Sequence, residues 1–374
     1  MSTIEESVKK INDFYSFKPG ADIYKKEFGY YAVDKWREQG YLKKEDEIDD
    51  YQSYFEELFH LDKNAVAGLG SLGWDVAEFY PKYDEEILED RGECELVQDT
   101  SGRGVLYFKG RRQGYMPQYI THPVKDMKTW EENVKWRLNP NDPHRKILAD
   151  KQAAEAAKGQ AIGKIVRQWS IGGYMYLRSL MGPEDLLYKF YDEPELIHSC
   201  MESWLALADY ITAYHQQSVS IDELFLGEDI CYKTGSLIAP DMIREFLFPY
   251  YQQLIENMRR RNKKPLHLYI DTDGYCNCVI DLYKELGMTH ISPLEVASGC
   301  DVVEIAKQYP DLLLEGGIDK RILADSKDAI AREVERIMSY MKPRGGYIPT
   351  CDHGVPEEVP FENYVYYREL MSHY

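Results

Sequence analysis

Short apolar runs recur through the second half of the chain, and each is followed by a longer amphipathic stretch. The runs cover residues 162–169, 224–228, 266–271, 290–296, 312–317 and 347–351. The stretches between them, at residues 184–214, 240–261, 278–286, 302–309 and 326–341, carry apolar residues near helical spacing. Strands that alternate with helices pair in parallel through right-handed crossovers. The pattern therefore predicts a parallel α/β sheet.

The number of strand–helix units favours a barrel. An earlier apolar, glycine-rich run at residues 65–73 predicts a seventh strand, and an eighth is not obvious. No GxGxxG motif follows a strand, which removes the simplest argument for a dinucleotide-binding sheet. We expect an α/β fold of the (β/α)8 TIM barrel class with an N-terminal helical and hairpin extension.

The first 145 residues differ in pattern from the rest. They contain acidic helical stretches and a glycine-punctuated segment, residues 99–119, that predicts a β-hairpin. A cluster of helix breakers, Asn139-Pro140-Asn141-Asp142-Pro143, follows. We expect residues 1–145 to be an extension that covers one barrel mouth and residues 146–374 to form the main body of the barrel, within a single structural domain.

The net charge and the cysteines limit the binding partners and the cellular compartment that we expect for the protein. The 374 residues include 45 Lys and Arg against 64 Asp and Glu, a net charge of −19. Such a surface repels phosphate backbones and anionic lipids, so we expect no nucleic-acid partner and no membrane binding. The N-terminus lacks signal-peptide character, and the seven cysteines form no CxxC pair. These features predict a cytoplasmic protein with reduced thiols.

Candidate chemistry gathers where the predicted strands end, because those ends converge on one mouth of a barrel. The polar candidates there are Glu228, Tyr232, Lys233, Asp271, Asp273, Glu295 and His353, with His267 inside a strand. Carboxylates dominate this group. Their burial together would be costly unless cations, hydrogen bonds or a metal ion compensate.

Several of these residues also have an ordinary structural interpretation. Asp271 and Asp273 could cap the helix that follows them. His267 lies within a strand and could be a core histidine. His353 stands at a strand end beside a glycine, so it is the better candidate for a metal ligand or an acid–base group.

Aromatic residues and one acid are candidates for substrate contacts. The chain has 31 Tyr against 12 Phe, a bias that suits partly wet cavities. Trp169, Tyr174 and Tyr176 could line an aromatic pocket, or the two tyrosines could simply pack on a helix face. Glu295 could contact the substrate, or it could pair with Lys320 or the arginine beside it.

Four motifs at these strand ends belong together. They read Glu228-Asp229-Ile230-Cys231-Tyr232-Lys233-Thr234-Gly235, Asp271-Thr272-Asp273-Gly274, Gly316-Gly317-Ile318-Asp319-Lys320-Arg321, and Gly345-Gly346-Tyr347-Ile348-Pro349 continuing through Asp352-His353-Gly354-Val355-Pro356. Over roughly residues 160–370 the chain resembles the uroporphyrinogen decarboxylase-like superfamily. The resemblance implies a (β/α)8 barrel. The superfamily also contains cobalamin-linked methyltransferases that act with coenzyme M and the methyltransferases of anaerobic O-demethylase systems.

The chain departs from the decarboxylases near its N-terminus. Those enzymes carry an Arg-Gln-Ala-Gly-Arg-Tyr stretch whose arginines hold substrate carboxylates, whereas this chain reads Phe14-Tyr15-Ser16-Phe17-Lys18-Pro19-Gly20. A chain at −19 without that clamp is poorly suited to a porphyrinogen. His353 nevertheless occupies the position of the decarboxylase histidine. Decarboxylation is therefore the alternative interpretation, and a non-catalytic ligand- or corrinoid-binding barrel is a second one.

The comparison with the coenzyme M methyltransferases implies a metal site. Their zinc is held by a His-x-Cys-Gly strand end and a distant Cys, and the matching positions here are Asp271, Asp273 and His353, supported by Glu228 or Glu295. Such harder ligands fit zinc as a Lewis acid but suit activation of a thiol less well.

The resemblance therefore implies methyl transfer from a methoxylated, aromatic compound to a separate corrinoid (cobalamin) protein. The residues it assigns to the chemistry are Glu228, Tyr232, Lys233, Asp271 and His353. The family also makes a homodimer conceivable.

Overall fold

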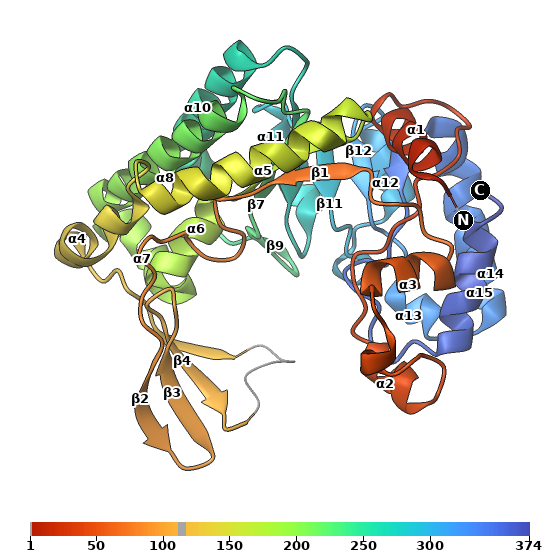
Figure 1. Ribbon diagram of the computed structural model, residues 1–374, viewed down its shortest axis with the longest axis horizontal. Helices are drawn as coiled ribbons and strands as arrows, with labels where there is room; N and C mark the ends of the chain where they lie inside the picture. The colour runs from red at the N-terminus through yellow and green to blue at the C-terminus, as the bar shows by residue number, and fades with distance from the viewer. Residues whose placement is uncertain (1, 111–116) are drawn as a thin grey trace.

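The computed structural model describes residues 2–110 and 117–374, and its centre is one curved sheet of seven parallel strands (Figure 1). In sheet order they are β1 (Val66–Leu69), β6 (Ile165–Ile171), β7 (Glu223–Gly227), β10 (His267–Asp271), β11 (His290–Ser292), β12 (Leu313–Glu315) and β13 (Tyr347–Ile348). Each strand overlaps one of the seven predicted apolar runs. The predicted TIM-barrel class is confirmed in this form, with seven strands in the described sheet.

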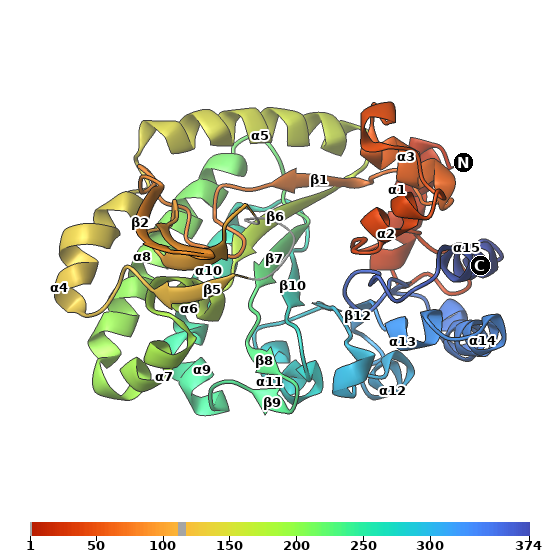
Figure 2. The ribbon, with the colours of Figure 1, turned by 90° about the horizontal axis from the view of Figure 1, so that it is seen from below.

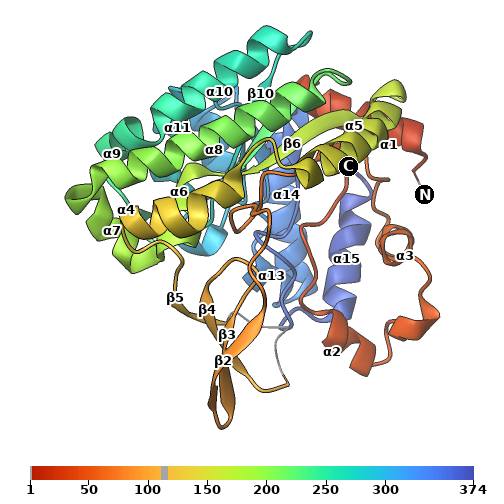
Figure 3. The same ribbon diagram turned by 60° about the vertical axis from the view of Figure 1, so that its left-hand side comes forward.

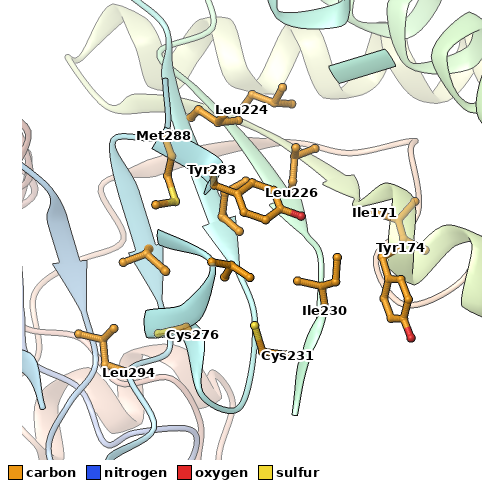
Figure 4. Close-up of a cluster of buried hydrophobic side chains, with 14 of the residues drawn as sticks. Ile171, Tyr174, Leu224, Leu226, Ile230, Cys231, Cys276, Tyr283, Met288 and Leu294 are labelled. Carbon is orange, nitrogen blue, oxygen red and sulfur yellow. The ribbon is translucent and has the colours of Figure 1, made fainter. Parts of the chain in front are cut away.

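Helices cover the outer face of the sheet, as parallel crossovers require. They are α5 (Pro143–Ala161), α6 (Gly173–Met181), α7 (Pro183–Asp192), α8 (Pro194–His215), α9 (Pro240–Phe246), α10 (Phe248–Arg261), α11 (Ile280–Lys284), α12 (Val302–Gln308), α13 (Lys320–Leu323), α14 (Lys327–Arg344) and α15 (Phe361–Met371). Helices α5, α8 and α10 lie side by side (Figure 3). Apolar side chains such as Leu224 and Leu226 of β7 and Tyr283 of α11 fill the layer between sheet and helices (Figure 4).

Helix α1 (Ile4–Tyr15) closes the amino-terminal end of the barrel. Its first turn is fixed by a capping box between Thr3 and Glu6. On its apolar face, Ile11 and Phe14 pack with buried residues at the starts of the barrel strands, among them Ile165. The beginning of the chain therefore covers the end of the barrel opposite to the strand ends that carry the candidate chemistry.

An extended segment, residues 24–30, lies at the seam between the first and last strands of the sheet. The hydroxyl of Tyr24 accepts a hydrogen bond from the backbone N–H of Ala65, just before β1. Tyr30 forms a parallel bridge with Val355, after β13. Helices α2 (Val33–Glu38) and α3 (Tyr51–Leu58) lie outside this seam (Figure 2). This segment stands where an eighth barrel strand would be.

A separate antiparallel sheet projects beside the carboxyl ends of the barrel strands (Figures 1 and 3). Its strands are β2 (Glu86–Arg91), β3 (Cys94–Gln98), β4 (Gly104–Phe108) and β5 (Gln118–Thr121), in that order. The predicted hairpin at 99–119 covers the β3–β4 turn, and its residues 111–116 lie outside the described residues. Because β1 belongs to the barrel sheet, the first 145 residues are shared between barrel and extension, and the division at 145 stays a prediction.

The inside of the barrel carries a buried ion pair. Arg167 on β6 stands in register with Glu223 on β7, with 2.5 Å between its Nε and Oε2 of Glu223. Nδ1 of His290 lies 2.9 Å from Oε1 of the same carboxylate, and all three side chains are buried. Burial by itself raises the pKa of Glu223, but Arg167 and His290 outweigh it and bring the value to about 2.

An aromatic layer follows the ion pair toward the carboxyl ends. Ring centroids are 4.5 Å apart between Trp169 and Phe225, and 4.8 Å apart between Phe225 and Tyr269. Tyr269 stacks on His290 at 3.6 Å. The barrel is therefore filled by charged and aromatic groups in place of the branched aliphatic residues that usually dominate.

The Arg167→Met variant tests the contribution of the ion pair. We expect its free energy of unfolding to fall by about 3–5 kcal/mol, because Glu223 is left buried without its cation. Urea unfolding measures this loss. The folded pKa of Glu223 is depressed from 4.5 to about 2, so its contribution should be complete above the unfolded value and disappear as the pH falls through the folded one. The double variant Arg167→Met/Glu223→Gln should recover most of the loss, and equal losses in both variants would contradict this account.

Candidate functional site

Three side chains from different strand ends meet at the carboxyl face. Asp273 follows β10, Glu295 follows β11 and His353 follows β13. Their ligand atoms all lie within 4.8 Å of one another. Nδ1 of His353 is 3.3 Å from Oδ1 of Asp273 and 3.9 Å from Oε1 of Glu295. This group, the Asp273–Glu295–His353 triad, contains the residue that the sequence favoured most, His353.

Local backbone geometry holds the triad in place. Gly274 has a φ of 78°, and its N–H donates to Oε2 of Glu295 at 2.9 Å. His353 has a φ of 118°, which costs energy for a residue with a side chain and persists only where the surroundings impose it. Its neighbour Asp352 provides part of that constraint, since Oδ2 of Asp352 accepts a hydrogen bond from the N–H of Val296 at 2.8 Å. The loops that carry Glu295 and His353 are therefore tied together.

Further acids with raised pKa values surround the triad. Burial raises the pKa of Asp271 to about 7, and the carboxylate of Asp273 adds to the shift while a hydrogen bond from Ser292 opposes it. Burial also raises the pKa of Asp229, although Arg178 lies 2.5 Å from Oδ2 of this residue. The site is thus short of positive charge.

The triad fits a metal ion of zinc type. Two ligands bonded at about 2.1 Å to one tetrahedral ion lie about 3.4 Å apart, close to the separations around His353. Nδ1 of His353 is buried and makes no aligned hydrogen bond with the described residues, and the Asp273 carboxylate beside it raises the pKa of His353. One ring nitrogen and two carboxylates are ordinary zinc ligands. Asp273, Glu295 and His353 would hold the ion.

Aromatic side chains stand on the other side of the mouth. Trp74, which is half exposed, stacks on Phe225 at 4.9 Å and lies 5.1 Å from Trp169. Trp169 also lines a cavity of about 550 Å³ along the seam between β1 and β13. Phe28 lines the same cavity, and its ring centroid is 5.1 Å from that of His353. The cavity therefore adjoins the triad through one shared aromatic ring.

The structure places Glu228 away from the triad. Its carboxylate is fully buried and accepts hydrogen bonds from the hydroxyls of Tyr251, at 2.6 Å, and Tyr283, at 2.8 Å. It lies against the start of α6, where any side chain at Gly172 would collide with it. Burial raises the pKa of Glu228 to about 7. Its sequence position after β7 resembles that of the triad residues, but its surroundings are those of a core group.

The remaining candidates are dispersed. His267 stands at the start of β10, with its ring 5.0 Å from that of Tyr15 of α1, so it belongs to the amino-terminal end of the barrel. Tyr174 and Tyr176 are almost completely buried, and the Tyr176 hydroxyl donates to the carbonyl of Cys200. Tyr232 and Lys233 are exposed on the ribbon that follows β7.

The structure also bears on the helix-capping interpretation of Asp271 and Asp273 and on the ion-pair interpretation of Glu295. Neither Asp271 nor Asp273 caps the short helices that follow β10. Glu295 accepts from the Gly274 N–H and the Ser298 hydroxyl, whereas Lys320 lies near Asp352.

Sequence reasoning missed Phe28 and Trp74 on this face, and it placed Asp229 and Asp352 in the strand-end motifs without choosing them as site residues. Asp229 and Asp352 directly follow or precede candidates that it did select, so their position at strand ends was an available signal. Phe28 and Trp74 lie in irregular segments without a periodic pattern, and nothing in the sequence brings them to the mouth.

Comparison with known proteins places the chain in a family. Residues 106–374 match the family model described as uroporphyrinogen decarboxylase (URO-D). The chain belongs to this family. Uroporphyrinogen decarboxylase of Thermus thermophilus is 27% identical over 184 residues, which cover 49% of this chain and 50% of the relative. The enzyme of Geotalea uraniireducens is 23% identical over 182 residues, covering 48% and 50%.

The fold of the chain is also similar to that of a protein with a different name. The chain spans about half the length of the curated relatives it matches. A solved structure, a methyltransferase from Methanosarcina mazei, superposes with a TM-score of 0.56 and 13% identity over 100% of this chain and 99% of that chain. At that identity the likeness concerns the fold alone. The superfamily recognised from the four motifs is confirmed.

The His353→Ala variant tests the metal site. Removal of one of three ligands should lower zinc affinity at least about 100-fold. Loss of a residue that only supports a ligand lowers the affinity by up to about 100-fold. Competition with a chromophoric chelator measures the affinity. His144→Ala, on the exposed start of α5, is the matched control and should bind zinc like the parent protein. Equal affinities of the two variants would show that His353 is not a ligand.

The Glu228→Gln variant tests the placement of Glu228 in the core. The folded pKa of Glu228 is raised from 4.5 to about 7, so the native state keeps a proton that the unfolded chain loses. Stability should therefore decline as the pH rises through that window. Glutamine cannot ionise, so the variant should lack this decline and be more stable above the window by up to roughly 3 kcal/mol. Unfolding across a pH series measures it, and identical pH profiles would refute the placement.

Proposed function

We propose that the protein transfers the methyl group of a methoxylated aromatic compound to the corrinoid of a separate protein. The observation that carries the proposal is the Asp273–Glu295–His353 triad, with ligand atoms within 4.8 Å of one another at the carboxyl face of the barrel. An unactivated aryl ether loses its methyl group only if the oxygen is stabilised as it departs. A zinc ion held by the triad would supply that stabilisation as a Lewis acid.

The side chains around the triad have complementary tasks. The pKa of Asp271, about 7, means that a share of the protein carries its proton near neutral pH. Asp271 can then donate this proton to the departing oxygen, which leaves as a phenol while the methyl group passes to the reduced cobalt of the partner. The chain itself needs no covalent nucleophile. Tyr232 and Lys233, exposed beside the mouth, are available to contact the substrate or the partner protein.

The aromatic wall supports an aromatic donor. Trp74 and Trp169 present flat apolar surface on the side of the mouth opposite to the acids, and offset stacking on such rings orients a planar substrate. The shared ring of Phe28 links this surface to His353. In this proposal a methoxyarene would lie with its ring on the aromatic wall and its ether oxygen toward the triad.

The arginines argue against a porphyrinogen. Binding of its carboxylates would require free arginines, and three arginines of the barrel each have an acidic partner within the protein. Arg167 pairs with Glu223 inside the barrel, Arg178 with Asp229, and Arg244 with Glu285 on the outer helices. An internal acidic partner already compensates each of these three charges, which favours a neutral substrate.

Decarboxylation of a porphyrinogen is the second candidate function. Family membership favours it, as does the position of His353 in the last motif. It requires cations at the mouth, whereas the acids Asp229, Asp271, Asp273 and Glu295 gather there. Release of carbon dioxide from uroporphyrinogen distinguishes it from methyl transfer.

The cellular setting is part of the proposal. None of the helices in residues 2–110 and 117–374 combines the length and the apolar character needed to cross a membrane. We place the enzyme in the cytoplasm, where a soluble corrinoid protein can reach the barrel mouth.

The activity can be tested with zinc-loaded protein, a reduced corrinoid protein and a panel of methoxyarenes. We expect absorbance changes that report a methylated corrinoid, together with release of the matching phenol. Asp271→Asn should lower the rate about 10²–10⁴-fold through loss of the acid. Asp328→Asn, on the exposed start of α14, is the matched control and should keep the parent rate. Carbon dioxide release from uroporphyrinogen without any methylated corrinoid would overturn the proposal.

A further inference from the structure

Four of the seven cysteines gather beside the triad as two close pairs. Sγ of Cys231 lies 3.9 Å from Sγ of Cys278, and Sγ of Cys276 lies 3.5 Å from Sγ of Cys300. Cys231 begins the short strand β8 (Cys231–Tyr232), and the turn η4 (Cys276–Cys278) follows β10. All four are free thiols. Figure 4 shows Cys231 and Cys276 on these two facing segments.

The facing segments are joined to the loop that carries a triad ligand. The backbone N–H of Cys231 donates to Oγ1 of Thr272 at 3.1 Å. The N–H of Tyr275 donates to the carbonyl of Tyr232 at 2.9 Å. Residues 272–275, which include Asp273, therefore rest directly on β8. A change in the distance between β8 and η4 must move this loop.

Accessibility separates the two pairs. Cys278 is exposed, whereas Cys231, Cys276 and Cys300 are buried. A thiol must reach both solvent and a second thiol to form a disulfide by exchange with a small molecule. The closer pair, Cys276 and Cys300, lacks the first property. In the other pair, the exposed Cys278 has both properties, and the buried Cys231 needs only to reach Cys278.

We propose that Cys231 and Cys278 are a redox-active dithiol that closes to a disulfide in response to a low-molecular-weight disulfide such as oxidised glutathione. The thiolate of Cys278 attacks one sulfur of the oxidant, which gives a mixed disulfide and releases one glutathione thiolate. The thiolate of Cys231 then attacks the sulfur of Cys278 and releases the second glutathione. Two protein thiols are oxidised, one glutathione disulfide is reduced to two thiols, and the protein protons pass to the released thiolates.

The second step is the slower one. Burial raises the pKa of the Cys231 thiol, and the neighbouring Cys278 adds to the shift, so little Cys231 thiolate is present at any moment. The mixed disulfide on Cys278 should therefore precede the closed form.

Closure acts on the candidate metal site. The sulfur atoms must approach from 3.9 Å to about 2.05 Å, which draws η4 toward β8 and displaces the loop of Asp273. Loss of a group that orients a metal ligand weakens metal binding by about 10–100-fold, and we expect an effect of that order when the loop of Asp273 is disturbed. This consequence rests on the proposed function of the triad as a zinc site, whereas the disulfide itself does not.

The test treats the full-length protein with oxidised glutathione, blocks remaining thiols with an alkylating agent, and maps peptides without reduction. We expect a cross-linked peptide pair that contains Cys231 and Cys278. In the Cys231→Ser variant the reaction should stop at the mixed disulfide between Cys278 and glutathione. Cys94→Ser, on β3 of the separate antiparallel sheet, is the matched control and should form the cross-link like the parent.

The outcomes separate the two parts of the inference. A persistent mixed disulfide on Cys278 in the parent protein, or a link between Cys276 and Cys300 in its place, would overturn the dithiol. With the cross-link formed, unchanged zinc affinity in the chelator competition would overturn its coupling to the triad. A protein that forms the cross-link but transfers no methyl group would refute the proposed function and leave the dithiol intact.

Discussion

Arg167 and Glu223 face each other across two neighbouring strands at a depth where water cannot solvate either charge. Each group therefore depends on the other, since removal of one leaves a buried charge without compensation. The pair forms only if β6 and β7 keep the register that sets Arg167 opposite Glu223. A slip of either strand by one residue would turn its charge into the apolar layer under the helices and leave the other charge unpaired. The same register sets Trp169 opposite Phe225, so the aromatic layer of the barrel follows from the ion pair.

The ion pair is also connected to the chemistry at the mouth. His290 contacts Glu223 with one ring nitrogen and stacks under Tyr269. The hydroxyl of Tyr269 lies 2.5 Å from that of Ser292, and Ser292 donates to Asp271 at 2.6 Å. The acid at the end of β10 is thus held by a chain of polar groups that begins in the barrel interior. Rigid support of this kind is what keeps a reactive group in a productive position.

Sequence pattern was sufficient for the barrel and for half of the site. The seven strands are apolar runs bounded by turn residues, which is why their positions could be predicted, whereas residues 24–30 mix Lys, Glu and Tyr and give no strand signal. Strand-end position selected Asp273, Glu295 and His353. The same rule selected Glu228, but the absence of a side chain at Gly172 lets that carboxylate turn into the core beside α6. Direction of a side chain after a strand end depends on its tertiary neighbours, and spacing along the chain carries no information about them.

The acids at the barrel mouth determine which substrate charge the mouth favours. Asp229, Asp271, Asp273 and Glu295 share one face, and nearby cations neutralise only part of their charge. Burial raises the pKa values of Asp229 and Asp271, and the carboxylate of Asp273 adds to both shifts. A divalent ion at the triad would offset part of the negative charge on this face. A polycarboxylate substrate would add negative charge where the protein already carries an excess, whereas a neutral methoxyarene would add none. The charge at the strand ends, more than the barrel itself, is therefore the reason that we propose methyl transfer over decarboxylation.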